Sequence, residues 1–470
     1  MNFILKGTFL IFIFYPFVLP QEYDILVLGA GFSGLGAAIQ LGKNNVNNFL
    51  VLEAKDYIGG RIKQVPFGGV TIELGAGWIH DADILPQKYY DLSKKYNMKL
   101  HSVNYANVLY KWKNGTKVDE NLKLRTENEL SNKYLNMKNI ALKRYQEGRG
   151  GVNMRTALRM ADWIPDTYMK QAAEYFQLDF ENGVIPEDID AITSGSTGSG
   201  KDFINADPRG YSFPVLEEAK FIKDKILLKH EVTKIEQLAN KKYTVYTTKG
   251  TFSAKHVLVT FSTGVLLSKK ITFIPELPLW KTEALSMVPM NHYCKIFLQF
   301  KNAFWDTKPE YIVVTGNDRG YFQHWQTFDF KTLYPGKNIL LATLTGETCK
   351  KYHLISDVEV VDEIYAVLKG MYAQATKPTA ILRSSWSTDP HVMGSYSTQT
   401  GGINEDDYRA LDHPVNASLW FTGEYKGREE FGYAHKALEL GMEEAERIIK
   451  CIRVYHCPEP RPTRKIYCSR

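Results

Sequence analysis

A glycine-rich turn near the N-terminus restricts this chain to a small number of folds. Residues 23–45 read YDILVLGAGFSGLGAAIQLGKNN, in which Gly29, Gly31 and Gly34 form the pattern GxGxxG between an apolar strand and a helix. The first glycine makes the turn, the second lets the backbone approach a pyrophosphate, and the third allows the helix to pack on the strand. The helix N-terminus adds unpaired amides and a positive dipole end. The pattern predicts a dinucleotide site in a βαβ unit.

A carboxylate stands where such a site needs one. Glu53 lies nineteen residues after Gly34, at the end of the apolar segment NNFLVLEA that we expect to be the second strand. In dinucleotide-binding units a carboxylate at this place binds a ribose hydroxyl. Gly59, Gly60 and Arg61 follow, and they suit a second close approach of backbone to phosphate with a neutralising charge. The alternative is a structural turn with an exposed glutamate.

The rest of the chain shows helical and strand patterns around a central insert. Helix-type apolar spacing runs from about residue 121 to 178, and a small-residue loop follows at 190–202. Strand-type alternation is found at 225–238, 243–261 and 292–300, and the chain ends with a strand, a loop and a long amphipathic helix. A chain of 470 residues exceeds what one core usually holds, so we expect two domains.

The charge pattern argues against nucleic acid as a partner. The net charge is +6, and residues 451–470 supply +4 of it through five basic residues and one acidic residue. In the rest of the chain the basic and acidic residues nearly balance, so we expect no long basic face. Residues 456–470 are predicted to be a solvated basic tail.

The N-terminal segment has the length and composition of a signal peptide. The apolar run Phe9–Leu19 follows Lys6, and Pro16 and Pro20 argue against an uninterrupted helix. The run is too short for a stable membrane span, so we expect residues 1–20 to be a signal peptide and the protein to be secreted. A small-residue cleavage site is missing, and a retained anchor is the alternative.

Sequons and cysteines fit the same route. Glycosylation triplets begin at Asn114 and Asn416. The cysteines are Cys294, Cys349, Cys451, Cys457 and Cys468. Three of them lie near the C-terminus, where a disulfide of open pairing is expected in a secreted protein. A zinc site formed by these three and His456 is the alternative, although its ligand spacing is unusual and no metal site is expected.

Several motifs resemble the flavin amine oxidase superfamily, and within it the polyamine oxidases. Residues 59–78, GGRIKQVPFGGVTIELGAGW, resemble its extended glycine-glycine-arginine motif, and the resemblance covers residues 22–455. It recurs in ADPRGYSFPV, PELPLWKTEAL, YCKIFLQFKNAFW, WFTGEY and GYAHKALELGMEEAERII, in the family's order. The resemblance implies an α/β fold, in which an FAD-binding Rossmann-type (glutathione-reductase-like) domain carries an inserted α+β substrate-binding domain.

The resemblance also implies how the chain divides. The FAD-binding domain is expected to be discontinuous, and the substrate-binding domain is expected to lie between its parts. The predicted ranges are 22–100, 205–285 and 380–455 for the first domain, and 101–204 and 286–379 for the second.

By resemblance, FAD is bound without a covalent bond. Segment 425–435, YKGREEFGYAH, lacks the attachment cysteine of monoamine oxidases. Trp386 resembles the aromatic wall of the cofactor cavity, with a core tryptophan as the alternative, and Val232 resembles a residue whose backbone contacts the adenine. The expected cofactor residues are Gly29, Gly31, Gly34, Glu53, Arg61, Gly75, Trp78, Val232, Trp386, Glu424 and Tyr433.

Four residues are expected by resemblance to act on the substrate. Lys295 matches a lysine that holds a water against the flavin, and strand alternation places Tyr293 and Lys295 on one face. The alternative is an edge-strand lysine that faces solvent. Tyr396 and Tyr433 match two aromatic residues that sandwich the amine, and His80 matches a residue of the substrate tunnel that binds a secondary amine.

One position departs from the plant-type enzymes, which carry a second glutamate in the tunnel. Val184 aligns with it, and Glu181, Glu187 or Asp188 would replace it after a small shift. The sequence therefore leaves polycation specificity open.

The expected reaction is the oxidation of spermine, spermidine or their acetylated forms by oxygen, which gives an aldehyde, a shorter amine and hydrogen peroxide. An L-amino-acid oxidase is the alternative among enzymes, and it needs an arginine for the carboxylate, for which Arg383 and Arg428 are candidates. A catalytically silent flavin-binding protein is the alternative from another class. Neither a nucleic-acid partner nor a stable membrane span is expected, and the sequence leaves the oligomeric state open.

Overall fold

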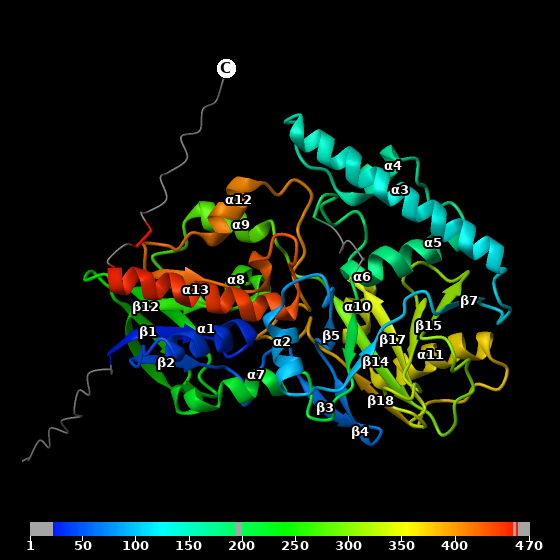
Figure 1. The fold of residues 1–470 in the computed structure, drawn as a ribbon, viewed down its shortest axis with the longest axis horizontal. Helices are drawn as coiled ribbons and strands as arrows, with labels where there is room; N and C mark the ends of the chain where they lie inside the picture. The colour runs from blue at the N-terminus through cyan, green and yellow to red at the C-terminus, as the bar shows by residue number, and fades with distance from the viewer. Residues whose placement is uncertain (1–21, 194–199, 455–456, 459–470) are drawn as a thin grey trace, which may run out of the picture.

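The computed structural model describes residues 22–193, 200–454 and 457–458. The expected signal peptide, Cys468, His456 and most of the basic tail lie outside these residues. The described chain is a mixed α/β structure built around two large sheets that lie side by side (Figure 1).

The first large sheet contains the glycine-rich turn. Its central strands β12, β1 and β2 run parallel, and four consecutive residues of β1, from Ile25 to Leu28, are fully buried. A parallel sheet covered on both faces needs such continuous apolar runs. The strand order is β13-β10-β11-β12-β1-β2-β9, with β19 also paired to β12. The strands are β1 (Glu22–Leu28), β2 (Phe49–Leu52), β9 (Ile226–Leu227), β10 (Val232–Gln237), β11 (Tyr243–Thr247), β12 (Gly250–Val259), β13 (Thr272–Ile274) and β19 (Leu419–Phe421).

Helices from the two ends of the chain pack against this sheet and against each other. Figure 1 shows α1 (Phe32–Lys43) beside α13 (Ala434–Val454). Glycines make the close approach possible, because a Cβ at Gly36 would lie 2.3 Å from the Leu438 carbonyl oxygen and a Cβ at Gly441 would lie 1.9 Å from that of Ser33. The C-terminal helix thus supports the helix that begins at the glycine-rich turn.

The second large sheet has the order β18-β14-β17-β16-β15-β7. Its members are mostly antiparallel, and β15 pairs with β7 in parallel. Residues 380–383 were expected with the FAD-binding segments, but they form β18 and pair with β14. The strands are β7 (Val108–Trp112), β14 (Tyr293–Gln299), β15 (Tyr311–Thr315), β16 (His324–Thr327), β17 (Ile339–Thr345) and β18 (Ala380–Arg383).

Two small sheets accompany the two large ones. The hairpin of β3 (Gln64–Phe67) and β4 (Val70–Glu73) follows the arginine of the GGR motif. The order β5-β8-β6 joins β5 (Trp78–Ile79), β8 (Phe203–Asn205) and β6 (Leu100–Ser102). This pairing brings the residues after β5 beside those before β8.

The remaining helices cover the sheets or connect them. The helix-type spacing expected from about 121 to 178 corresponds to α3 (Glu120–Gln146) and to the shorter helices that follow it, and the long helix expected at the end of the chain is α13. Besides α1, α3 and α13, the described helices are α2 (Lys88–Lys95), α4 (Met154–Met160), α5 (Tyr168–Glu174), η1 (Tyr175–Asp179), α6 (Phe180–Asn182), α7 (Phe213–Glu218), η2 (Lys220–Lys225), α8 (Thr263–Leu267), α9 (Leu279–Ser286), α10 (Gly346–Leu354), α11 (Asp357–Met371), α12 (Glu405–Asp412) and η3 (Glu424–Lys426).

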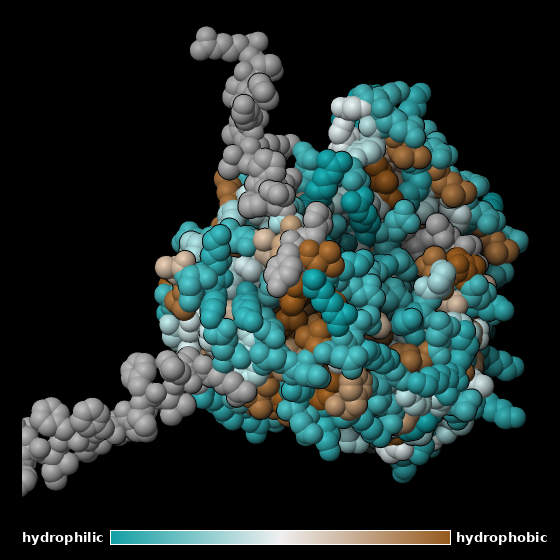
Figure 2. Space-filling model, turned by 60° about the vertical axis from the view of Figure 1, so that its left-hand side comes forward, coloured by the Kyte–Doolittle hydropathy of each residue, from teal (hydrophilic) through white to brown (hydrophobic). Residues whose placement is uncertain are grey.

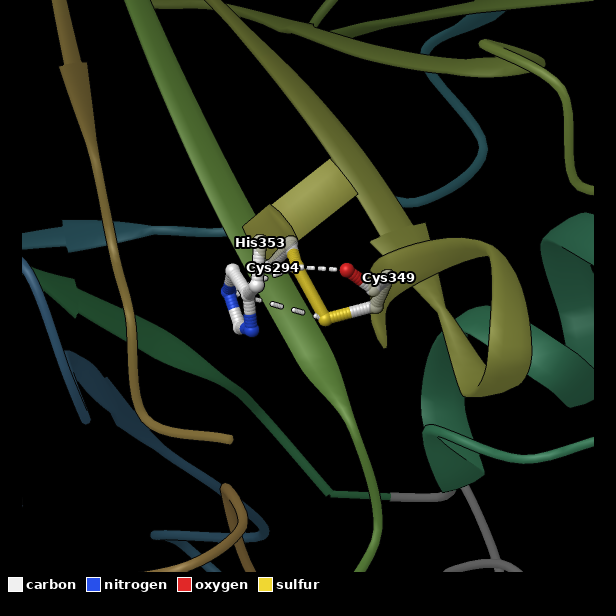
Figure 3. Close-up of side chains that lie close together, drawn as sticks. All are labelled: Cys294, Cys349 and His353. Atoms are coloured by element: carbon white, nitrogen blue, oxygen red, sulfur yellow. Dashed lines mark hydrogen bonds between the residues drawn. A yellow bond between two sulfur atoms is a disulfide. The ribbon is translucent and has the colours of Figure 1, made fainter. Parts of the chain in front are cut away.

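Two disulfides join described residues. Cys451 and Cys457 are paired, which takes two of the three C-terminal cysteines. Cys294 on β14 is paired with Cys349 on α10, with a Cα–Cα distance of 5.4 Å, and the sequence did not predict this bond. His353 lies beside it, with Nε2 2.9 Å from the Cys294 sulfur (Figure 3). Both sulfurs are used in the disulfide, so this cluster lacks the thiolates that would bind a metal.

Hydrophilic residues cover most of the molecular face drawn in Figure 2, as expected for a chain with 23% charged residues. Among the described helices, we find none with the length and apolar character needed to cross a membrane.

Candidate active site

A single extended cavity brings nearly all the expected site residues together. It runs from the glycine-rich turn, past β14, to the segment after β5. The expected residues that line it are Gly29, Gly31, Glu53, Arg61, Gly75, Trp78, His80, Val232, Lys295, Trp386, Tyr396, Glu424 and Tyr433. Gly34 is the exception. A Cβ there would lie 1.9 Å from the Gly29 carbonyl oxygen, so Gly34 provides the close contact between helix and strand.

The glycine-rich turn leaves room for a ligand. Gly29 has a φ of +106°, a conformation that L side chains rarely adopt. A Cβ at Gly31 would meet no protein atom within 4 Å, so the backbone at this position borders open space in the cavity. The amides at the start of α1 lie directly beside this space, as a pyrophosphate site requires.

Glu53 is buried and tied to the turn. Its Oε2 accepts a hydrogen bond from the Ala30 amide at 2.6 Å, and its Oε1 accepts one from the Lys55 amide at 2.9 Å. Only 7% of the residue is exposed, so the alternative of an exposed glutamate is wrong. The carboxylate oxygens keep lone pairs that can accept ribose hydroxyls.

Arg61 and Glu424 form an ion pair in the wall of the cavity. Arg61 also donates to the Ser395 carbonyl at 3.0 Å, and Glu424 accepts from the amide and hydroxyl of Ser397, both at 3.2 Å. Arg61 therefore stands at the cavity with its direction fixed by two partners. The glycines, the Glu53 carboxylate and this guanidinium together fit a flavin dinucleotide.

Two tryptophans enclose the next part of the cavity. Trp386 lines it although only 7% of the residue is exposed, so it is a cavity wall and a buried side chain at once. Its Nε1 donates to the Leu74 carbonyl at 3.3 Å. The Trp78 ring lies 4.5 Å from the Lys295 ammonium nitrogen.

Lys295 faces the cavity from the middle of β14. Its Nζ donates to the Gly75 carbonyl at 2.5 Å and to the Glu73 carbonyl at 3.3 Å. Burial lowers the pKa of Lys295 to about 7, against the opposing effect of the Glu73 charge. The expected alternation is confirmed, because Tyr293 and Lys295 line the cavity whereas Cys294 is bonded to α10 on the other side. The alternative of a solvent-facing lysine is wrong.

Glu73 is a charged neighbour that sequence reasoning missed. Its Oε1 accepts from the Tyr211 amide at 2.6 Å and from the Asn205 amide group at 2.9 Å, while Oε2 has no partner among the described residues. Burial raises the pKa of Glu73 to about 7, against these hydrogen bonds and Lys295. A glutamate in the apolar run VTIEL was the signal that could have identified it.

Aromatic rings line the cavity beyond Lys295. The Tyr396 ring lies 6.0 Å from that of Tyr293, and burial raises the pKa of both Tyr396 and Tyr433. The Tyr433 ring stacks on His80, with centroids 4.7 Å apart and planes inclined by 15°.

His80 is paired with an aspartate that the sequence did not single out. The His80 Nδ1 lies 2.8 Å from Asp202 Oδ2, and the Asp81 amide donates to Asp202 Oδ1 at 2.9 Å. Burial lowers the pKa of His80, but the hydrogen bond to Asp202 and the charges of Asp202, Glu181 and Asp81 outweigh it and raise that pKa overall. Asp202 follows a small-residue segment without periodicity, so no pattern marked it.

Among the three candidates for the missing tunnel glutamate, Glu181 lines the cavity. Burial raises its pKa, while the charge of His80 acts in the opposite direction. Glu187 instead pairs with Arg155 at 2.8 Å, and Asp188 is exposed. Val184 is packed in an apolar cluster under α3 and α4.

The described residues that line the cavity include no cysteine, and Arg61 is the only arginine among them. Arg428 pairs with the exposed Glu405 at 2.8 Å, and Arg383 binds the Tyr352 carbonyl at 2.6 Å. Neither candidate for a carboxylate clamp lines the cavity.

Comparison with known proteins agrees with this geometry. The sequence profile of the family described as flavin containing amine oxidoreductase matches residues 32–449. Polyamine oxidase 1 of Zea mays is 29% identical over 463 residues, which cover 92% of this chain and 91% of that protein. Polyamine oxidase 6 of Oryza sativa subsp. japonica is 29% identical over 461 residues, 92% of each protein. Since the match spans most of the chain, this protein belongs to the flavin containing amine oxidoreductase family and is a flavin-dependent oxidoreductase acting on amines, with FAD as its cofactor.

Proposed function

We propose that this enzyme oxidises polyamines, such as spermine, spermidine or their acetylated forms, and releases an aldehyde, a shorter amine and hydrogen peroxide. The observation that carries the proposal is the partly buried negative charge at the end of the cavity beyond Lys295. Glu181 lines the cavity there, and Asp202 lies directly behind His80. Partly buried carboxylates stabilise the remote ammonium groups of a polycation, which a simple monoamine does not have.

The names of the relatives support the same substrate class. Both relatives described above are named polyamine oxidases and align over nearly their whole lengths. The absence of a carboxylate clamp among the described cavity residues weighs against an L-amino-acid oxidase, since Arg61 is held by Glu424.

In this proposal Lys295, Tyr396 and Tyr433 orient the reacting amine. The bound flavin supplies the redox chemistry, accepting two electrons from the amine and returning them to oxygen. Lys295 donates to two backbone carbonyls and keeps the capacity to hold a water in the cavity. With a pKa near 7 it exists in both protonation states at neutral pH. Tyr396 and Tyr433 present rings that attract a cationic amine and limit its orientation.

We also propose that the second large sheet and its helices form a substrate-binding domain inserted into an FAD-binding domain. The order of the sheets in the chain supports this division, because β1, β2, β9–β13 and β19 belong to one sheet while β7 and β14–β18 belong to the other. Lys295 on β14 then reaches the cofactor from the substrate-binding side.

Secretion is a further part of the proposal. The apolar run of residues 9–19 supports it, and so do the disulfides Cys294–Cys349 and Cys451–Cys457, which persist in oxidising compartments.

Peroxide release tests the proposed function. The purified protein would be assayed with spermine, spermidine, their acetylated forms, simple monoamines and L-amino acids. We expect the highest kcat/KM on a polyamine. A clear preference for L-amino acids, or flavin binding without peroxide from any amine, would replace the proposal with one of the two alternatives.

A further inference from the structure

We propose that His80 and Asp202 act together as the base that removes a proton from the ammonium form of the substrate before its carbon is oxidised. This inference rests on the proposed function, because it assumes that an amine occupies the cavity beside His80. It adds a chemical step to a residue otherwise expected only to bind the substrate.

The pairing of two short strands builds this dyad. Ile79 of β5 lies opposite Phe203 of β8 in an antiparallel ladder, so His80 and Asp202 are the next residues on either side. The His80 Nδ1 and the Asp202 Oδ2 are 2.8 Å apart. Both residues are largely buried, with 21% and 12% of their side chains exposed. Contacts between oppositely charged groups are strong in such a setting.

Three donors fix the direction of the Asp202 carboxylate. Besides His80, the Asp81 amide donates to Oδ1 at 2.9 Å and the Tyr105 hydroxyl donates to Oδ2 at 3.0 Å. A carboxylate held in this way cannot turn away from the imidazole without losing two further hydrogen bonds.

The contact with Asp202 determines which ring nitrogen of His80 is free to react. An ionised carboxylate only accepts hydrogen bonds, so Nδ1 carries the hydrogen and the lone pair of the neutral ring is on Nε2. No hydrogen bond to Nε2 occurs among the described residues. The ring lines the cavity and is stacked on Tyr433, which holds its plane.

The surroundings of His80 favour the gain of a proton. The titratable groups that face it are Asp202 and Asp81 on neighbouring backbone, Glu181 after η1, and the phenols of Tyr105 and Tyr433. The carboxylates raise the pKa of His80 against the effect of burial, and His80 in turn lowers the pKa of Asp202 against burial. An aspartate that orients an imidazole and stabilises its protonated form is a general device for base catalysis.

The proton transfer is balanced within the site. The N–H bond of the substrate ammonium breaks and its electron pair stays on the substrate nitrogen. The proton forms a new bond with the lone pair of His80 Nε2, and the resulting imidazolium is balanced by Asp202. The substrate nitrogen then has the lone pair that would stabilise positive charge on the adjacent carbon as the hydride of that carbon passes to the FAD. The proton is afterwards released to water.

The pH dependence of kcat/KM tests the dyad. Wild type, Asp202→Asn and the exposed control Asp188→Asn would be measured on spermine. Loss of the carboxylate removes an effect that raises the pKa of His80, so we expect the acid limb of Asp202→Asn to move to lower pH. We expect its plateau to fall by roughly 10²-fold, the lower end of what a positioned base contributes. The control should keep the wild-type limb. An unshifted limb in Asp202→Asn would overturn the assignment.

A second measurement needs no turnover. Histidine-labelled protein would be titrated by NMR, with the His80 signal identified by its loss in His80→Gln. We expect the His80 signal to titrate above the range of a free histidine in wild type, and at lower pH in Asp202→Asn. The same His80 titration in both proteins would refute the pairing.

Chemical rescue covers the case in which Asp202→Asn does not fold. We expect His80→Gly to recover turnover when imidazole is added, because Asp202 and Tyr433 would bind the small base where the side chain was. No recovery at any imidazole concentration would contradict the base role.

The failure of the proposed function and the failure of the base role can be told apart. Absence of peroxide from every amine overturns the proposed function, whereas normal wild-type turnover with an unshifted acid limb in Asp202→Asn overturns the base role alone.

Discussion

Arg61 and Glu424, which are 363 positions apart in the chain, form an ion pair at the wall of the cavity. The glutamate is almost fully buried, with 4% of its side chain exposed, and the arginine has 24% exposed. The pair joins the loop before β3 to η3, and therefore connects two segments that follow strands of the first large sheet, β2 and β19. Removal of one partner of a buried pair leaves an uncompensated charge and costs about 3–5 kcal/mol.

Arg61→Ala should release the flavin. The variant loses the positive charge that we expect to neutralise the pyrophosphate and leaves the charge of Glu424 without its arginine partner, so we expect flavin affinity to fall by at least roughly 10²-fold. The measurement is flavin absorbance retained after gel filtration, together with a titration of the stripped protein with FAD. Arg428→Ala is the matched control, because it breaks an exposed pair with Glu405. Equal flavin retention in both variants would remove Arg61 from the cofactor site.

The flavin should leave the protein on denaturation. The described cavity residues include no cysteine, and the four described cysteines are in disulfides, so the described part of the chain offers no free thiol to attach the cofactor. Acid precipitation should leave the yellow colour in the supernatant. Colour in the pellet that resists washing with denaturant would show a covalent bond.

The sequence predicted the parts of this site that depend on local chain geometry. The GxGxxG turn, Glu53 and the alternation at Tyr293 and Lys295 follow from backbone periods and spacings that act over a few residues. Neighbouring residues specify such features, so a single sequence is enough to locate them.

The features that the sequence did not predict come from contacts between distant segments. Asp202 meets His80 across 122 positions because β5 pairs with β8, and Cys294 meets Cys349 because α10 follows β17 beside β14. No local pattern encodes either pairing. For the same reason β18 was expected in the other set of segments, since its sequence gives no indication of which sheet it joins.

Lys295→Met should change stability in a pH-dependent way. The folded pKa of Lys295 is near 7, below its ordinary value, so the charged form is penalised in the folded state below pH 7 and the penalty disappears between pH 7 and about 10.5. The variant removes this penalty. Its stability relative to wild type should therefore be higher at pH 6 than at pH 9, by roughly 2–3 kcal/mol at about 1.4 kcal/mol per pH unit.

Thermal unfolding of the flavin-free proteins at pH 6 and pH 9 would measure this difference. Lys301→Met, at an exposed position just after β14, is the matched control and should show the same shift at both pH values. A constant difference between Lys295→Met and wild type would mean that Lys295 titrates normally.

Secretion should leave a glycan on Asn114. Asn114 is exposed, and its Oδ1 accepts from the Thr116 hydroxyl at 2.8 Å, so both residues of the triplet lie at the surface together. The Asn416 amide instead donates to Gln237 at 2.9 Å, and Asn416 has a φ of +52°. We expect full glycan occupancy at Asn114 and lower glycan occupancy at Asn416, measured by mass spectrometry after enzymatic deglycosylation.

The secreted protein in the same sample should have its N-terminus close to Gln21. Secreted protein without glycans, or with Met1 intact, would contradict this route.

Glu181→Gln should separate long substrates from short ones. A hydrogen bond to a charged amine is worth about 1.5–3 kcal/mol, so loss of the carboxylate should lower kcat/KM on spermine by roughly 10- to 100-fold. A monoamine that does not reach Glu181 should lose little. Glu187→Gln is the control, since that carboxylate pairs with Arg155 outside the cavity.

The pH dependence of substrate choice gives an independent check of Glu181. Burial raises the pKa of this carboxyl, so wild type should lose its preference for spermine over a monoamine as pH falls through that pKa and the charge disappears. In Glu181→Gln the preference should be small and should not change with pH over the same range. Equal losses on long and short amines would mean that Glu181 supports Tyr433 or the fold. A preference that persists in the variant would assign polyamine recognition to another group, and Asp81, whose charge also acts on Glu181, is the next residue to test.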